Sequence, residues 1–138
     1  LVGLYKWNNA YIFDEVLYKK GLLNSEISNI LKAHEIKDLI YADSAEPKSI
    51  AELNSYGHQV LPVSKGRDSI VYGINLINQN EVYVTSRSKN LINELENYAW
   101  AKGNTEKPID SFNHILDGAR YITTYLIEES HRGDYNIW

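Results

Sequence analysis

Apolar positions along this chain recur with two different periods, and each change of period marks an expected element. Short apolar runs, typical of buried strands, alternate with longer stretches in which apolar residues return every three or four positions, as on one helix face. The runs predict strands at residues 1–7, 10–18, 38–43, 59–63 and 81–85. The longer stretches predict helices at residues 24–34, 47–56, 89–102 and 111–127, and one more that begins at Ser69.

The order of these elements predicts the fold class. Asn8-Asn9 separates the first two strands, and Asn tolerates the positive φ of a tight hairpin turn. An antiparallel hairpin followed by alternating strands and helices predicts an α/β fold, with a mixed β-sheet flanked by helices. We expect one domain over residues 1–127 and a polar C-terminal tail over residues 128–138.

Composition narrows the class of protein. The 138 residues, 43% of them hydrophobic, suffice for one domain with its own core. The absence of cysteine excludes disulfides and thiolate zinc sites. No apolar run approaches the roughly 20 residues of a membrane span, so we expect no membrane partner. The chain starts at Leu1 with neither a signal peptide nor an initiator Met, and we expect it to be an excised fragment.

The net charge of −4 at pH 7 bears on binding to nucleic acids. A protein that binds DNA tightly through a broad basic surface is usually basic, so the charge argues against such binding by this chain alone. It does not argue against a nuclease, because carboxylates that bind a metal add negative charge that the metal neutralises.

The first candidate site residue is Asp43, which directly follows the apolar run Leu39–Ala42. In open α/β sheets, ligands collect beyond the carboxyl ends of strands, which favours Asp43 as a metal ligand. The alternative is a helix N-cap ahead of Pro47, and spacing alone gives the two interpretations equal weight. Glu46 either supports a metal ligand or is a first-turn acid that favours the helix dipole, and the second interpretation is preferred.

The second candidate group lies on one face of the last predicted helix. Asp110, His114 and Asp117 are spaced four and three residues apart, so they share a face opposite the apolar stripe. A solvated polar face is the common explanation of such spacing. Carboxylates beside a histidine also suit a hard divalent cation, Mg²⁺ or Mn²⁺, with His114 as general acid or base. With Asp43, they predict metal-dependent hydrolysis of phosphodiesters.

Three basic residues are candidate contacts for a nucleic-acid backbone: Lys65, Arg67 and Arg87. Lys65 and Arg67 flank Gly66 just before a helix start, where amides and cations hold phosphate well. The segment lacks the GxxxxGK[ST] spacing of a P-loop, so nucleotide hydrolysis is not indicated. Ordinary solvated charge is the preferred interpretation of these residues.

Several short motifs occur in an order that is more specific than any one of them. They are Asp43-Ser44-Ala45-Glu46-Pro47, Ile50–Leu53, Lys65-Gly66 with Ser69-Ile70, Asn97–Trp100 and, most specific, Asn113–Tyr121. In this order, the chain resembles the C-terminal nuclease domain of the large terminase subunit of tailed bacteriophages. The resemblance covers Leu1 to about Ile127.

This resemblance implies an RNase H-like fold and a metal-dependent endonuclease that cleaves concatemeric double-stranded viral DNA during packaging. It implies Mg²⁺ or Mn²⁺ as cofactor, Asp43 and Asp117 as metal ligands and His114 as a catalytic residue near the metals. Asp110 and Glu46 are expected to support these residues. The implied partners are double-stranded DNA, the terminase ATPase domain, the portal and the small terminase subunit. The implied location is the host cell cytoplasm.

One acid of the family's cluster has no counterpart here. The family carries it on the first strand of its fold, and Leu1–Trp7 matches the second strand. We therefore expect the chain to lack that first strand, to bind metal weakly and to cut DNA poorly unless the strand is restored. If the chain is active as it stands, Asp14 or Glu46 is the expected substitute ligand.

Two other interpretations remain open. One is a non-catalytic RNase H-like domain that docks to DNA or to packaging proteins. The other is an unrelated RNase H-like nuclease or resolvase. Measuring bound metal on protein with the first strand restored is the experiment that best separates these interpretations.

Overall fold

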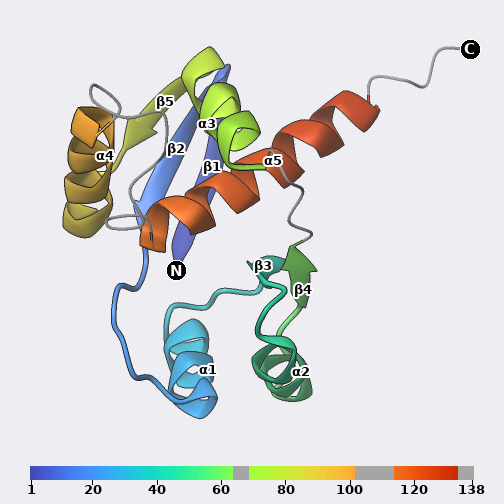
Figure 1. Ribbon diagram of the computed structural model, residues 1–138. Coiled ribbons are helices and arrows are strands. Elements are labelled where there is room, and N and C mark those ends of the chain that lie inside the picture. Colours follow the sequence, from blue (N-terminus) through green and yellow to red (C-terminus); the bar gives the residue numbers. More distant parts are fainter. Residues whose placement is uncertain (64–68, 102–113, 134–138) are drawn as a thin grey trace, which may run out of the picture. The chain divides into compact units, whose positions relative to one another are not determined.

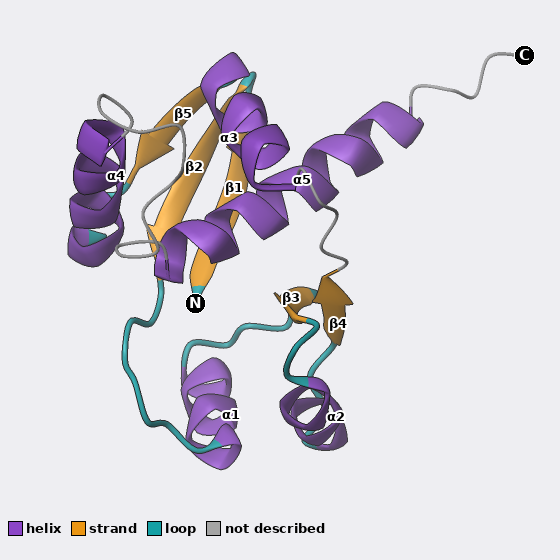
Figure 2. Ribbon diagram, viewed as in Figure 1, coloured by secondary structure: helices purple, strands orange, loops and turns teal. Residues whose placement is uncertain are grey.

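The computed structural model describes residues 1–63, 69–101 and 114–133 (Figure 1). The chain divides into two compact units. The first unit combines Leu1–Tyr18 with Asp68–Trp138, and the second unit is Lys19–Arg67. Each unit contains its own group of hydrogen-bonded strands (Figure 2). The two units are therefore described separately.

The sheet of the first unit has the strand order β1-β2-β5. β1 (Val2–Trp7) pairs antiparallel with β2 (Ala10–Glu15), and β5 (Glu81–Val84) pairs parallel with β2. Asn8 adopts a φ of 53° in the turn between β1 and β2, which confirms the predicted hairpin. The sheet is therefore mixed, as the sequence pattern predicted.

Three helices contribute to the core of the first unit. They are α3 (Ser69–Gln79), α4 (Lys89–Ala101) and α5 (His114–Gly133). Alternate strand residues face these helices because side chains of a strand point to opposite faces in turn. The buried side chains that form the main cluster are Val2, Phe13, Leu91, Ile115, Leu116 and Ala119. In Figure 1, α5 runs across the sheet and lies against α3, as their contacts also show.

The second unit is a parallel strand pair with two helices. β3 (Ile40–Asp43) and β4 (Val60–Val63) are joined through α2 (Pro47–Ser55), and α1 (Asn24–Ala33) precedes them. The core of this unit consists of Ile50, Leu53 and Val60, with Ile27, Ile40 and Ala42 against them. Pro47 occupies the first turn of α2, as expected of a residue without an N–H to donate.

The order of all ten elements agrees with the order predicted from the sequence, and the differences lie at element ends. The second strand ends at Glu15 rather than Tyr18. The last helix continues to Gly133, so the predicted polar tail of residues 128–138 is helical as far as that glycine. Glu, His and Arg all permit a helix, and glycine commonly ends one, which explains this extension.

The described helices also bear on a membrane role. In the part of the chain that the structure describes, no helix combines the length and the apolar character needed to cross a bilayer.

Candidate functional site

Asp43 is the last residue of β3, and its half-buried side chain shapes the turn that follows. Its Oδ1 accepts a hydrogen bond of 2.9 Å from the backbone N–H of Ala45. Its carbonyl oxygen accepts one of 3.1 Å from the N–H of Glu46. The N-cap position of α2 belongs to the exposed Glu46, which makes no capping bond with its side chain. Asp43 is therefore a turn residue at a strand end, and the N-cap alternative for it was wrong.

Asp117 lies in the first turn of α5, with its side chain 34% exposed. Its Oδ1 accepts a hydrogen bond from Nη2 of Arg120, and the two side chains form an ion pair. Residues three apart on a helix are neighbours on its surface, which brings the two charges together. The side chain of Arg120 is only 7% exposed. The candidate ligand Asp117 is thus ion-paired with the buried guanidinium of Arg120.

A buried carboxylate on α4 holds the start of α5. Glu94 is 2% exposed, and its Oε2 accepts hydrogen bonds of 2.9 Å and 3.0 Å from the N–H groups of Ile115 and Leu116. Its Oε1 accepts a bond of 3.1 Å from the hydroxyl of Tyr18. The first N–H groups of a helix lack partners within it, and a carboxylate there also favours the helix dipole. Glu94 thus fixes the turn of α5 that presents Asp117.

The structure describes the other candidate residues only in part. His114 is the first residue of α5, one turn before Asp117 along the backbone. The side chain of His114 lies outside the described residues, and so do Asp110, Lys65 and Arg67. The roles assigned to these four residues stay predictions.

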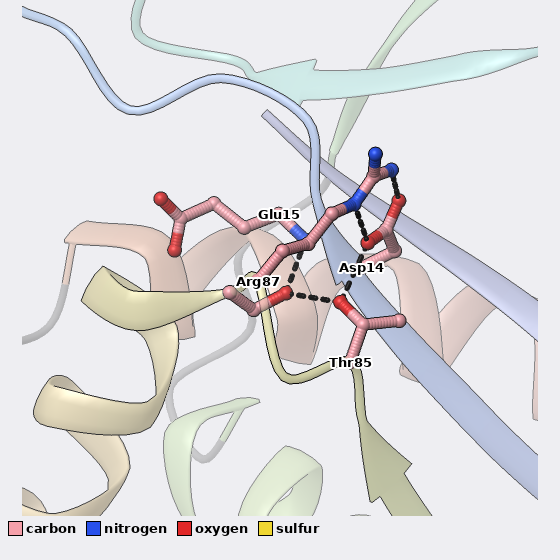
Figure 3. A network of polar contacts seen from close by, with 5 residues as sticks. Asp14, Glu15, Thr85 and Arg87 are labelled. Carbon is pink, nitrogen blue, oxygen red and sulfur yellow. Dashed lines mark hydrogen bonds and ion pairs between the residues drawn. The ribbon is translucent and has the colours of Figure 1, made fainter.

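Arg87, the remaining candidate contact for DNA, forms an ion pair with Asp14 of β2 (Figure 3). Nε of Arg87 donates to Oδ1 of Asp14 at 2.7 Å, and Nη2 donates to Oδ2. The hydroxyl of Thr85 also donates to Oδ1, at 2.6 Å. The Arg87 side chain nevertheless remains 69% exposed, so it is a surface cation in a fixed position. Both oxygens of Asp14 are engaged, which argues against Asp14 as a substitute metal ligand.

The same network joins β2 to the start of α4. The N–H of Glu15 donates to Oγ of the buried Ser88 at 2.8 Å. The carboxylate of Glu15 accepts hydrogen bonds from the side chain of Asn90 at 2.6 Å and from the N–H of Leu91 at 2.9 Å. Glu15 thus accepts a hydrogen bond from an N–H group at the start of α4, as Glu94 does at the start of α5. These acids hold helix ends, which is a structural role.

The stability of the first unit should fall in acid because of Asp14. Hydrogen bonds from Arg87 hold the pKa of Asp14 below its ordinary value of 3.8; burial opposes this effect, and Thr85 adds to it. A pKa lowered by folding stabilises the folded chain above pH 3.8, and this stability is lost as the pH falls through the folded-state pKa.

We expect Asp14→Asn to lower the stability of the protein at neutral pH. The variant should also show a smaller decline of stability below about pH 4 than the unaltered protein does. Urea unfolding at a series of pH values measures this, with exposed Asp38→Asn as control; the same decline in Asp14→Asn and unaltered protein would contradict it.

The residues present are of the kind that a hard divalent cation requires. Asp43 and Asp117 offer carboxylate oxygens from a strand end and from the first turn of a helix, and Mg²⁺ and Mn²⁺ prefer such ligands. Across residues 1–63, 69–101 and 114–133, no three acidic or histidine side chains gather closely enough to hold a metal ion. Since Asp43 and Asp117 belong to different units, their sharing of one cation stays a prediction.

Among the described residues, the burial of the charged side chains of Asp14, Glu94 and Arg120 was not predicted from the sequence. A signal for one of them was available, because Glu94 lies on the apolar stripe of its helix with Leu91 and Leu95. A charged residue on an apolar stripe indicates a buried partner. The partner itself was not predictable: Tyr18 is 76 residues from Glu94.

Solved structures define the class to which this fold belongs. The nuclease domain of the large terminase of bacteriophage SPP1, crystallised with bound Mn, is similar with a TM-score of 0.76 and 24% identity, over 90% of this chain and 76% of that one. The large terminase of a thermophilic bacteriophage is similar with a TM-score of 0.67 and 18% identity, over 90% of this chain and 35% of that one. The fold is therefore the RNase H-like fold of terminase nuclease domains, as expected.

Sequence comparison then shows the family. Residues 1–124 match the family described as "Terminase RNAseH like domain", and the chain belongs to this family. The large terminase subunit of Bacillus phage SPP1 is 27% identical over an alignment of 139 residues, and this alignment covers 95% of the present chain. The chain spans only 32% of the length of that relative. The family expected from the sequence motifs is thus confirmed.

Proposed function

We propose that this chain is the metal-dependent endonuclease domain of a viral DNA-packaging terminase, and that it cleaves concatemeric double-stranded DNA. The observation that carries the proposal is the family match over residues 1–124. The bound Mn of the SPP1 nuclease domain supports a divalent cation as cofactor, and we propose Mg²⁺ or Mn²⁺ for this chain. Asp43 and Asp117 supply the type of ligand that either ion needs.

In this proposal, Asp43 and Asp117 hold the metal, and His114 orients the attacking water or accepts its proton. The ion, when bound, supplies Lewis acidity that polarises the scissile phosphate and makes the water more acidic. Asp110 and Glu46 support these residues by hydrogen bonding. Glu94 keeps the first turn of α5 in place through the N–H groups of Ile115 and Leu116.

Contacts with DNA are proposed at Lys65, Arg67 and Arg87. Arg87 is suited to a backbone contact because its exposed guanidinium is held in one orientation by Asp14, so little side-chain freedom is lost on binding. This domain needs few basic residues of its own to bind DNA if the ATPase domain, the portal and the small terminase subunit also hold the DNA. These partners, and a location in the host cell cytoplasm, are part of the proposal.

A non-catalytic domain that docks to DNA or to packaging proteins is the second candidate. The observation in its favour is the lack of a metal-holding cluster within the described ranges 1–63, 69–101 and 114–133. Such a domain would bind DNA or a packaging protein with the same affinity whether or not a divalent cation is present.

The deciding experiment is a cleavage assay on plasmid and linear double-stranded DNA with added Mg²⁺ or Mn²⁺, or with EDTA. The assay uses this chain and, in parallel, the chain extended by the first strand that the family resemblance expects before Leu1. We expect the extended protein to cleave DNA with Mg²⁺ or Mn²⁺ and not with EDTA. Absence of cleavage under every metal condition, in a folded extended protein, would favour the docking domain.

A further inference from the structure

Arg120 is a buried cation with an incomplete set of partners. Its side chain is 7% exposed, and its Nη2 donates to Asp117. Its Nη1 is buried and has no hydrogen-bond partner in the part of the chain that the structure describes. Buried polar groups are nearly always paired, and an unpaired donor on a buried charge is costly.

The fold makes room for this arginine. Gly73 of α3 lies against its aliphatic stem: a Cβ atom at position 73 would lie 3.2 Å from Cβ and 3.3 Å from Cγ of Arg120. Such distances are shorter than ordinary contacts between carbon atoms. The absent side chain at position 73 therefore leaves room for the stem of Arg120 against α3.

The two members of the ion pair are constrained very differently. The stem of Arg120 is enclosed, and its guanidinium would lose the charged partner that it has among the described residues if it left Asp117. The Asp117 side chain is short and 34% exposed, so the residues packed around it restrain it less than those packed around Arg120 restrain the arginine. The arginine is thus the fixed member, and it selects one orientation of the aspartate.

We propose that Arg120 is a positioning residue for Asp117: it holds Oδ1 and thereby directs the other carboxylate oxygen toward the divalent cation. This inference rests on the proposed function, in which Asp117 is a metal ligand. Groups that hydrogen-bond to metal ligands commonly change metal affinity by roughly 10–100-fold when they are replaced. Gly73 takes part indirectly, because it sets the space in which Arg120 lies.

The decisive substitution is Arg120→Lys, because it keeps the positive charge and removes the planar pair of donors. Arg120→Met is less informative, since removing a cation near the metal would by itself strengthen metal binding. Gly73→Ala is a second test that alters neither member of the pair and displaces the arginine stem. The exposed Lys89→Met serves as a control for the loss of a distant charge.

The measurement is the dissociation constant for Mn²⁺, from titration followed by electron paramagnetic resonance, on the extended protein used for the cleavage assay. We expect Arg120→Lys to raise this constant by about 10-fold or more, Gly73→Ala to raise it by less, and Lys89→Met to leave it unchanged. Circular dichroism identifies folded variants. A purely structural role predicts lower melting temperatures with an unchanged dissociation constant for Mn²⁺, and that result would overturn the inference.

Asp117→Asn separates this inference from the proposed function. If Asp117→Asn loses Mn²⁺ and Arg120→Lys does not, the metal site stands and the positioning role is overturned. If Asp117→Asn binds Mn²⁺ as well as the unaltered protein does, the proposed site itself fails. The ¹³C chemical shift of the Asp117 carboxylate, recorded without metal, should differ between the unaltered protein and Arg120→Lys.

Discussion

Asp43→Asn and Asp117→Asn should each abolish metal-dependent cleavage of DNA. Asn keeps the shape of Asp and removes the charge that holds a hard cation. Replacing a group that only supports a metal ligand costs about 10–100-fold, so loss of a ligand should reduce the cleavage rate by more than about 100-fold. The rate is measured on double-stranded DNA with saturating Mn²⁺, on the protein extended by the expected first strand.

A matched control for these variants is Asp38→Asn, which removes an exposed carboxylate just before β3. It should cleave DNA at the rate of the unaltered protein. Asp117→Asn should also be less stable than Asp43→Asn, because it leaves the buried Arg120 without its charged partner. Full cleavage by folded Asp117→Asn protein would exclude Asp117 as a ligand, and the same result for Asp43→Asn would exclude Asp43.

Glu94→Ala should cause a large loss of stability in the first unit. It deprives the N–H groups of Ile115 and Leu116 of their acceptor in a buried setting and leaves a cavity beside Tyr18. Each unpaired buried N–H costs about 1–3 kcal/mol, so we expect a loss of about 3 kcal/mol or more in the free energy of unfolding. Urea unfolding followed by circular dichroism measures this loss.

Two variants show whether the capping bonds cause this loss. Glu94→Gln retains one oxygen that can accept both N–H groups, so it should lose much less stability than Glu94→Ala. Glu96→Ala removes an exposed carboxylate from the same helix and should change stability by at most about 0.5 kcal/mol. Equal losses for Glu94→Ala and Glu96→Ala would rule out the capping role of Glu94.

The sequence predicted the order of elements because hydrophobic periodicity is a local property. The Asn8-Asn9 turn and Pro47 also follow from local backbone preferences, and the structure agrees with both. Element ends were less predictable: polar residues beyond Ile127 can join a helix or leave it, and only the complete helix decides.

The candidate site was predictable in part for the same reason. The placement of Asp43 at a strand end follows from the apolar run before it, and the structure confirms this placement. The partners of Asp14 and Glu94 were not predictable, because Arg87 and Tyr18 lie more than 70 residues away along the chain. The meeting of Asp43 and Asp117 depends on how the two units combine, and it stays a prediction.

The parallel pairing of β2 with β5 has a consequence for the order of folding. Ala10 pairs with Glu81, so this ladder closes only after the chain between them, including all of Lys19–Arg67, has been brought round. Pairing β2 with β5 closes a long loop, and forming the first unit therefore costs the conformational entropy of that loop. In the second unit, β3, α2 and β4 are joined by short connections, so the corresponding cost is smaller. Contacts between residues close in sequence form sooner than distant pairings. During synthesis, the second unit (Lys19–Arg67) can therefore form before β5 has left the ribosome and become available to pair with β2.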